Sequence, residues 1–164
     1  MLDTVKDLLA DEIKDLYSAE KQLTKAIPKM AEGSNDAQLK KALQDHLKET
    51  EGQVVRLEEV AALLEIEPTG KMCSGMAGVI QEGGEVLVEK GDDTILDLGI
   101  IGAGCRVEHY EIAAYMTAIS LAERLNAREV VALLKQSLDE EQAAETKLRE
   151  IAIGLIENTR AVAA

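Results

Sequence analysis

The chain has 164 residues and is 46% hydrophobic, yet it contains no Phe or Trp and only three Tyr. A core of Leu, Ile, Val, Ala and Met is typical of packed helices and argues against a β-sandwich. The net charge of −13 excludes the nucleic-acid-binding classes, because the phosphates would repel the protein.

Apolar residues spaced three and four apart predict amphipathic helices from end to end. We expect four long helices and a short third one, over residues 3–31, 36–65, 75–89, 93–125 and 127–158. The short helix is weakened by its glycines, and the last residues, 159–164, are expected to fray. The chain is therefore predicted to be all-α and to form one domain over residues 1–164.

Polar residues before the predicted helices supply candidate N-caps. One of residues 34–36 (Ser, Asn, Asp) is expected to cap the second helix, and Asp92 or Asp93 the fourth. The segment NARE predicts a capping box for the last helix, with Asn126 as the cap and Glu129 three residues later.

The predicted lengths define two helical hairpins joined by a long connection, residues 66–92, that carries the short helix. Such a connection allows the second and fourth helices to run parallel. The arrangement is that of a ferritin-like four-helix bundle.

The chain shows no signal for export, membrane insertion or disulfide formation. It has no charged-then-apolar leader and no apolar run of about 18 residues, so we expect a cytoplasmic protein. Cys73 and Cys105 are too few for a disulfide framework or a C-x-x-C metal site, and we expect reduced thiols.

Glutamates interrupt the apolar faces of the long helices near their middles. Glu20 lies on the face of the first helix, and Glu108 on that of the fourth. On the last helix, Glu141 and Glu145 do the same. A single such residue is explained by snorkelling or by pairing with Lys or Arg, but the explanation weakens when the pattern recurs.

The second helix follows a less regular pattern. Its inward face is expected to include His46, Thr50 and Gln53, with Glu49 on the flank beside His46. Because His46 lies one turn before Glu49, the pair could supply a nitrogen and an oxygen ligand. His46 is interpreted as a ligand or as the partner of one.

The distances of these glutamates from the turns place them in one layer. With turns near residues 33 and 125, the glutamates lie 13 to 17 residues from their turn, or about 20–25 Å along a helix. They are Glu20, Glu49, Glu108, Glu111 and Glu141. So many anions cannot stay ionised together in a core without counter-charge, and metal cations would supply it.

Glu108 and Glu111 are three residues apart, so both project toward one point. The intervening His109 is rotated by about 100° from Glu108 and could face a neighbouring helix or a second subunit, but a hydrogen-bonded core histidine is the interpretation we favour. Tyr17 and Tyr115 are interpreted as packing residues whose hydroxyl groups are satisfied, although either could donate an electron or a proton.

Five segments carry a resemblance to a known family: DLYSAEKQL (15–23), HLKETEGQVVRL (46–57), MAGVIQEGGEV (76–86), VEHYEIAAY (107–115) and LDEEQAAETKL (138–148). Together they resemble the YciF/YciE-like bacterial stress proteins, which are ferritin-like relatives of rubrerythrins and manganese catalases. The resemblance implies a homodimer and a two-metal carboxylate site. The residues it implies for that site are Glu20, Glu49, Glu108, Glu111 and Glu141, completed by Glu145.

The sequence departs from the ferritin-like pattern at two positions. That pattern has Glu-x-x-His on the second and last long helices, whereas Gly52 follows Glu49 here and Ala144 follows Glu141. The imidazole of His46 instead precedes its glutamate. The predicted site is rich in carboxylates, which suits Fe and Mn and disfavours Cu.

Three functions are compatible with these features. The first is a di-iron or di-manganese oxidoreductase acting on hydrogen peroxide or dioxygen, as a peroxidase or catalase does. The second is non-enzymatic iron handling. The third is a structural homodimer with a vestigial metal site, since the fourth helix is apolar around most of its circumference and is expected to be covered by the bundle or a partner.

Overall fold

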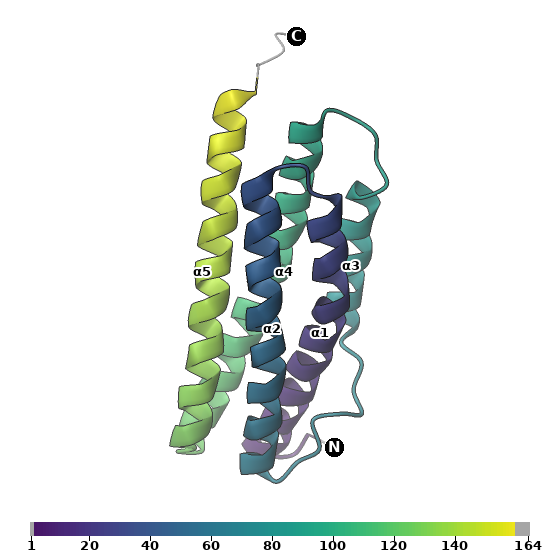
Figure 1. Cartoon of the computed structure of the whole chain (residues 1–164). Helices are drawn as coiled ribbons and strands as arrows, with labels where there is room; N and C mark the ends of the chain where they lie inside the picture. The colour runs from purple at the N-terminus through teal and green to yellow at the C-terminus, as the bar shows by residue number, and fades with distance from the viewer. Residues whose placement is uncertain (1, 160–164) are drawn as a thin grey trace.

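The computed structural model describes residues 2–159 and contains five helices and no strand within that range. The helices are α1 (Val5–Gly33), α2 (Ala37–Leu64), α3 (Ser74–Val86), α4 (Asp93–Arg124) and α5 (Arg128–Asn158). Figure 1 shows the four long helices side by side. The predicted all-α class is confirmed, and residues 160–164 of the end expected to fray lie outside the described range.

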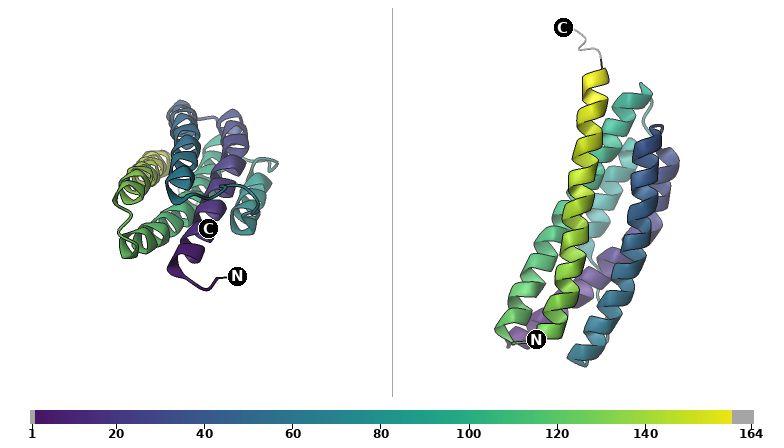
Figure 2. Two further views of the ribbon diagram at one scale, coloured as in Figure 1. Left: turned by 90° about the horizontal axis from the view of Figure 1, so that it is seen from below. Right: turned by 60° about the vertical axis from the view of Figure 1, so that its left-hand side comes forward.

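The long helices form two antiparallel hairpins, α1–α2 and α4–α5. Helix α2 packs on α5 and α1 packs on α4, while α3 packs against α4 and α1. The connection that carries α3 returns the chain to the end from which α2 started, so α2 and α4 run in the same direction (Figures 1 and 2). This is the predicted bundle topology.

The helix ends confirm two of the three predicted caps. Asp36 and Asp92 each accept hydrogen bonds from two backbone N–H groups at the start of α2 and α4. The capping box at Asn126 is wrong: α5 begins after Ala127 without a side-chain cap. Asn126 instead adopts a left-handed φ of 56° that ends α4, a conformation that Asn tolerates better than most residues. Helix α3 also ends three residues earlier than expected, at Val86.

The core consists of two apolar clusters at different heights in the bundle. One includes Leu23, Ile27 and Leu148 and lies toward the α1–α2 turn. The other includes Leu9, Leu57 and Leu134 and lies toward the opposite end. Between them the bundle buries Glu, His, Thr and Gln side chains from all four long helices. This polar layer lies at the height where the sequence predicts the glutamates.

The long connection is fixed to the bundle by polar contacts at the start of α3. The hydroxyl of Tyr110 donates to Asp15 (3.0 Å) and lies 3.0 Å from the sulfur of Cys73. Lys71 pairs with Asp11 and Asp15 at 2.6 and 3.3 Å. Cys73 and Cys105 are both free, and Cys73 is engaged in holding α3 in place.

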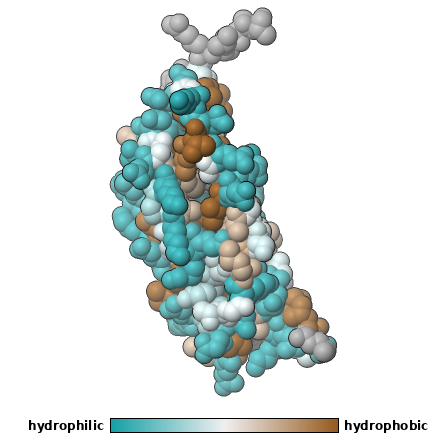
Figure 3. Space-filling model, turned by 90° about the vertical axis from the view of Figure 1, so that its right-hand side faces the viewer, coloured by the Kyte–Doolittle hydropathy of each residue, from teal (hydrophilic) through white to brown (hydrophobic). Residues whose placement is uncertain are grey.

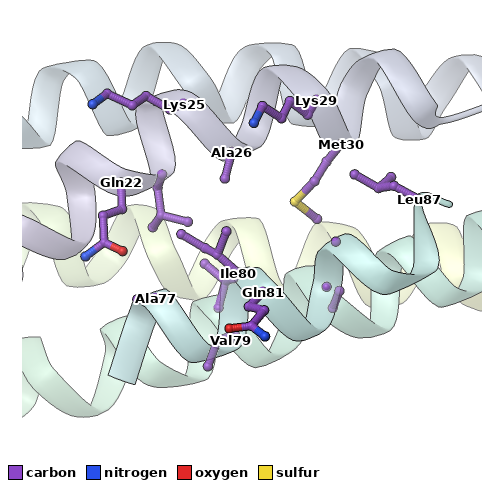
Figure 4. Close-up of a pocket in the computed structure, with 15 residues that line it drawn as sticks. Gln22, Lys25, Ala26, Lys29, Met30, Ala77, Val79, Ile80, Gln81 and Leu87 are labelled. Atoms are coloured by element: carbon purple, nitrogen blue, oxygen red, sulfur yellow. The ribbon is translucent and has the colours of Figure 1, made fainter. Parts of the chain in front are cut away.

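A cavity of about 380 Å³ lies between α1, α3 and α4. Its lining is mostly aliphatic, with Met30, Ile80 and Leu87 facing it and Lys25 and Lys29 on α1 (Figure 4). On the face of the molecule viewed in Figure 3, hydrophobic side chains are scattered among hydrophilic ones. None of the described helices is both long enough and apolar enough to cross a membrane.

Candidate metal centre

The centre of the polar layer is a cluster of four buried side chains from three helices. His46 comes from α2, Glu108 and Glu111 from α4, and Glu141 from α5; each offers one ligand atom, and these atoms all lie within 4.8 Å of one another. The Nε2 atom of His46 is 3.4 Å from a carboxylate oxygen of Glu108 and 3.7 Å from one of Glu141. The predicted convergence of these residues is present in the structure.

Helix α1 adds a fifth buried group, Glu20. One of its carboxylate oxygens accepts a 2.5 Å hydrogen bond from the hydroxyl of Tyr115, which is itself fully buried. Tyr115 therefore packs with its hydroxyl satisfied, as expected. The hydrogen bond fixes the orientation of Glu20 from the neighbouring helix, α4.

Buried polar atoms without hydrogen-bond partners are concentrated in this layer. Such atoms are rare in proteins, because each one costs the desolvation energy of a polar group. Glu111 has both carboxylate oxygens in this state, and Glu20, Glu108 and Glu141 have one each; the others are Nε2 of His46, Oγ1 of Thr50 and Oε1 of Gln53. Seven of these eight atoms carry lone pairs as carboxylate, hydroxyl or amide oxygens, and the eighth is an imidazole nitrogen. The set therefore fits a bound cation.

Burial and mutual repulsion shift the acid–base behaviour of the glutamates. Burial, followed by the charge of Glu141, raises the pKa of Glu20 and of Glu108 well above the ordinary value of 4.5. Burial and then the charge of Glu20 do the same to the pKa of Glu111. Neighbouring carboxylates cannot all ionise without counter-charge, so a cation would be needed to keep them all charged at neutral pH.

The pKa of His46 is also raised, although burial acts on an imidazole in the opposite sense. Burial alone lowers its pKa, but the hydrogen bond with Glu49 and the charges of Glu141, Glu49 and Glu140 outweigh burial, and its pKa is raised above 6.5. A metal would displace that proton, because only neutral imidazole is a ligand.

Hydrogen bonds between α2 and α5 fix the position of Glu141. The Nε2 atom of Gln53 donates to Glu141 through a short hydrogen bond and to Glu140 at 3.1 Å. Arg56 forms two 2.9 Å hydrogen bonds with Glu140 and one of 2.7 Å with Ser137. Residues that orient a ligand in this way tune the affinity of metal centres. The inward position of Gln53 follows from its spacing of seven residues from His46, but its role does not.

Two of the expected site residues lie outside the buried cluster. The side chain of Glu49 is 47% exposed, and it accepts a hydrogen bond at 3.3 Å from Nδ1 of His46. Glu145 is 13% exposed and is bound by Arg149 and by His109, at 3.2 Å from the latter. The structure does not bring these two carboxylates to the centre.

The interpretation of His109 as a core histidine is wrong. Its side chain is 58% exposed and lies beside Glu145 and Arg149 on the surface. The rotation of about 100° per residue that turns Glu108 and Glu111 inward turns the intervening His109 outward. Tyr17 donates a 2.9 Å hydrogen bond to the exposed Glu58 and takes no part in the cluster.

Comparison with known proteins places these features in a family. The family described as a domain of unknown function, DUF892, matches residues 4–161. The protein YciF of Escherichia coli is 40% identical over 156 residues, which cover 93% of this chain and 92% of YciF.

Solved structures agree with the sequence comparison. The crystal structure of the E. coli stress protein YciF matches with a TM-score of 0.93 at 37% identity, covering 96% of this chain and 99% of that one. YcfI of Rhodopseudomonas palustris matches with a TM-score of 0.87 at 42% identity, covering 90% and 94%. A two-domain protein of Anabaena variabilis that contains a ferritin-like domain matches with a TM-score of 0.63 at 14% identity, covering 99% of this chain and 40% of that one. The fold of this chain is ferritin-like.

Proposed function

The chain belongs to the DUF892 family, and on this premise we propose that it is a stress-response protein whose bundle holds two Fe or Mn ions and acts on hydrogen peroxide or dioxygen. The similarity to YciF, a stress protein, supports the physiological part of the proposal. The chemical part depends on the polar layer.

The observation that carries the proposal is the group of buried polar atoms without partners. A vestigial site would be expected to lose such atoms or to pair them, because each costs about 1–3 kcal/mol when left unsatisfied. Here they remain on four helices and face one another.

The residues that would hold the metals are His46, Glu108, Glu111 and Glu141, with Glu20 beside them. One nitrogen and several carboxylate oxygens form a donor set that suits Fe and Mn. When bound, a metal pair would supply a change of oxidation state. The chain's own part is to orient these ligands through Tyr115 and Gln53 and to enclose them between two apolar clusters.

The proposal is tested by metal analysis of the purified protein, with about two Fe or Mn ions per chain expected. Glu108→Ala should abolish metal binding and peroxide consumption, whereas Glu59→Ala, at an exposed position on α2, should leave both unchanged. A protein that purifies without metal and takes up none from Fe²⁺ or Mn²⁺ solutions would contradict the proposal.

Two alternative functions can be distinguished from the proposed one by the same measurements. In non-enzymatic iron handling, the protein would bind Fe²⁺ without consuming peroxide, and a loading of many iron atoms per chain would favour storage. If the protein has a structural role, the role for which YcfI is described as a candidate, the purified protein would contain almost no metal.

A cytoplasmic homodimer is also part of the proposal. Ile95 and Met116 on α4 are 56% and 54% exposed, so each leaves an apolar side chain that a second copy could cover.

A further inference from the structure

A second cavity leads to the candidate metal centre from outside the bundle. It has a volume of about 180 Å³ and lies between α2 and α5. Its inner wall includes His46 and Glu108, two of the clustered side chains, and its outer part includes Asp45, Glu49 and Lys147. The larger cavity beside α3 has none of the clustered residues in its lining.

Small side chains keep this cavity open. Ala42 lines it from α2, and Ala143 and Ala144 line it from α5. Ala144 lies one turn beyond Glu141, at the position where the ferritin-like pattern has a histidine. Because protein interiors are close-packed, larger residues at these positions would close the space, which has room for several water molecules.

The outer end of the cavity presents one carboxylate that no lysine neutralises. Asp45 is paired with both Lys41 and Lys48. Among the described residues, Glu49 forms an ion pair only with His46. Lys147, also at this end, has its ammonium 3.9 Å from Glu150. A cation that approaches the cavity therefore meets Glu49 as its available anionic ligand, beside the ammonium of Lys147, whose charge Glu150 offsets only in part at 3.9 Å.

His46 connects this outer carboxylate to the centre. Its Nδ1 atom is 3.3 Å from Glu49, and its Nε2 atom, on the other side of the ring, faces Glu108 and Glu141. The side chains of Glu49, His46 and Glu108 thus form a continuous series of ligand groups from solvent to the buried cluster, along the wall of one cavity.

We propose that the cavity between α2 and α5 is the route by which a divalent cation enters the centre, with Glu49 as its first ligand and His46 as the next. The inference depends on the proposed metal centre and assigns Glu49 a role in uptake and not in the final site. It also gives Ala42 and Ala144 a function, because their small size keeps the route open.

The test measures how fast metal-free protein takes up Co²⁺, followed by the visible absorbance of the bound ion after rapid mixing. Ala144→Leu and Ala42→Leu narrow the cavity from opposite helices, and each should slow uptake by about tenfold or more, since a close-packed interior passes ions only when it opens. The final number of Co²⁺ ions bound should equal that of the wild type. Ala132→Leu, the same change at an exposed position of α5 outside the cavity lining, is the matched control and should load at the wild-type rate.

Substitutions that change the charge at the entrance give a second test, because they should change the rate of Co²⁺ uptake in opposite directions. Glu49→Gln should slow uptake by about tenfold at low ionic strength, and Lys147→Gln should accelerate it, because charges at an entrance raise or lower the local concentration of ions. Both effects should shrink as salt is added.

The outcomes separate the route from the centre. If wild-type protein binds no Co²⁺, the proposed centre itself fails. If it binds Co²⁺ and both leucine variants load as fast as the wild type, the centre stands and the route is wrong. If both leucine variants load to a lower final stoichiometry than the Ala132→Leu control, the cavity is part of the site and the route is likewise overturned.

Discussion

Among the side chains that the structure describes, Glu111 has two buried oxygens without a hydrogen-bond partner, where the others in the polar layer have one at most. It is fully buried, and when it is ionised neither of its carboxylate oxygens has a hydrogen-bond partner. Burial and the charges of Glu20, Glu141 and Glu108 raise its pKa well above 4.5. In the absence of metal, Glu111 should therefore destabilise the fold, as functional residues often do.

Replacement of the Glu111 carboxylate by an apolar group should remove this loss of stability. We expect Glu111→Met, which keeps the length of the side chain, to stabilise the metal-free protein at pH 8 by about 1–3 kcal/mol, the usual cost of an unsatisfied buried polar group, while it weakens metal binding. Urea unfolding in EDTA measures the first effect and metal titration the second. Glu59→Met at an exposed site is the control, and a loss of stability in Glu111→Met alone would contradict this account.

At the same scale, the convergence of His46, Glu108, Glu111 and Glu141 could be predicted because helical periodicity and distance from the turns are both encoded locally. The positions of Glu49 and Glu145 outside this cluster could not be predicted in the same way. Glu145 lies on the predicted inward face, but its position depends on Arg149 and His109, which draw it toward the surface. Such competition between partners depends on tertiary structure.

At the scale of the elements, a buried aspartate joins the α1–α2 turn to α4. Asp97 is 2% exposed, and its two carboxylate oxygens accept hydrogen bonds from the backbone N–H groups of Asn35 and Asp36 at 2.8 and 2.7 Å. The contact fixes the height of the first hairpin against the second. The glutamates of α1 and α4 therefore meet in one layer partly because Asp97 holds the turn.

Asp97→Asn should weaken this junction, because an amide offers one acceptor oxygen where the carboxylate offers two. We expect a loss of about 1.5–3 kcal/mol in the free energy of unfolding, the range for hydrogen bonds to charged groups, with the final metal stoichiometry retained. Urea unfolding of the metal-free protein is the measurement. Asp93→Asn, an exposed residue in the first turn of the same helix, provides the comparison, and equal stabilities of the two variants would rule out the junction.

The existence and order of the five helices could be predicted from apolar spacing, because an amphipathic face is a property of consecutive residues. The ends were less predictable. Asn126 is a residue type that often caps the start of a helix, yet it ends α4 in a left-handed conformation. The turn between α4 and α5 is so short that one residue could either end the first helix or cap the second. Asp97 contacts residues more than 60 positions away in the sequence, and a contact over that distance cannot be predicted from a local sequence pattern.

At the scale of the whole molecule, the acidic layer links stability to pH. The carboxyl groups of Glu20, Glu108 and Glu111 have pKa values raised by burial in the folded state, whereas in the unfolded chain they ionise near 4.5. The folded state therefore binds more protons than the unfolded state above that pH, and stability falls as pH rises. The raised pKa of His46 acts in the same direction, with its contribution fully present below 6.5.

We therefore expect the metal-free protein to be more stable at pH 5 than at pH 8, and expect Mn²⁺ to remove or reverse this difference, because the cation stabilises the ionised carboxylates and binds only the folded state. Urea unfolding at both pH values, in EDTA and in Mn²⁺, measures it. The net charge of −13 adds surface repulsion of the same sign, so the comparison is repeated in about 1 M salt, where the Debye length is about 3 Å. A pH dependence that arises in the buried layer should survive the salt and should diminish in Glu111→Met. If the metal-free protein instead gains stability from pH 5 to pH 8, the layer does not hold uncompensated carboxyl groups, and its case as a metal centre is lost.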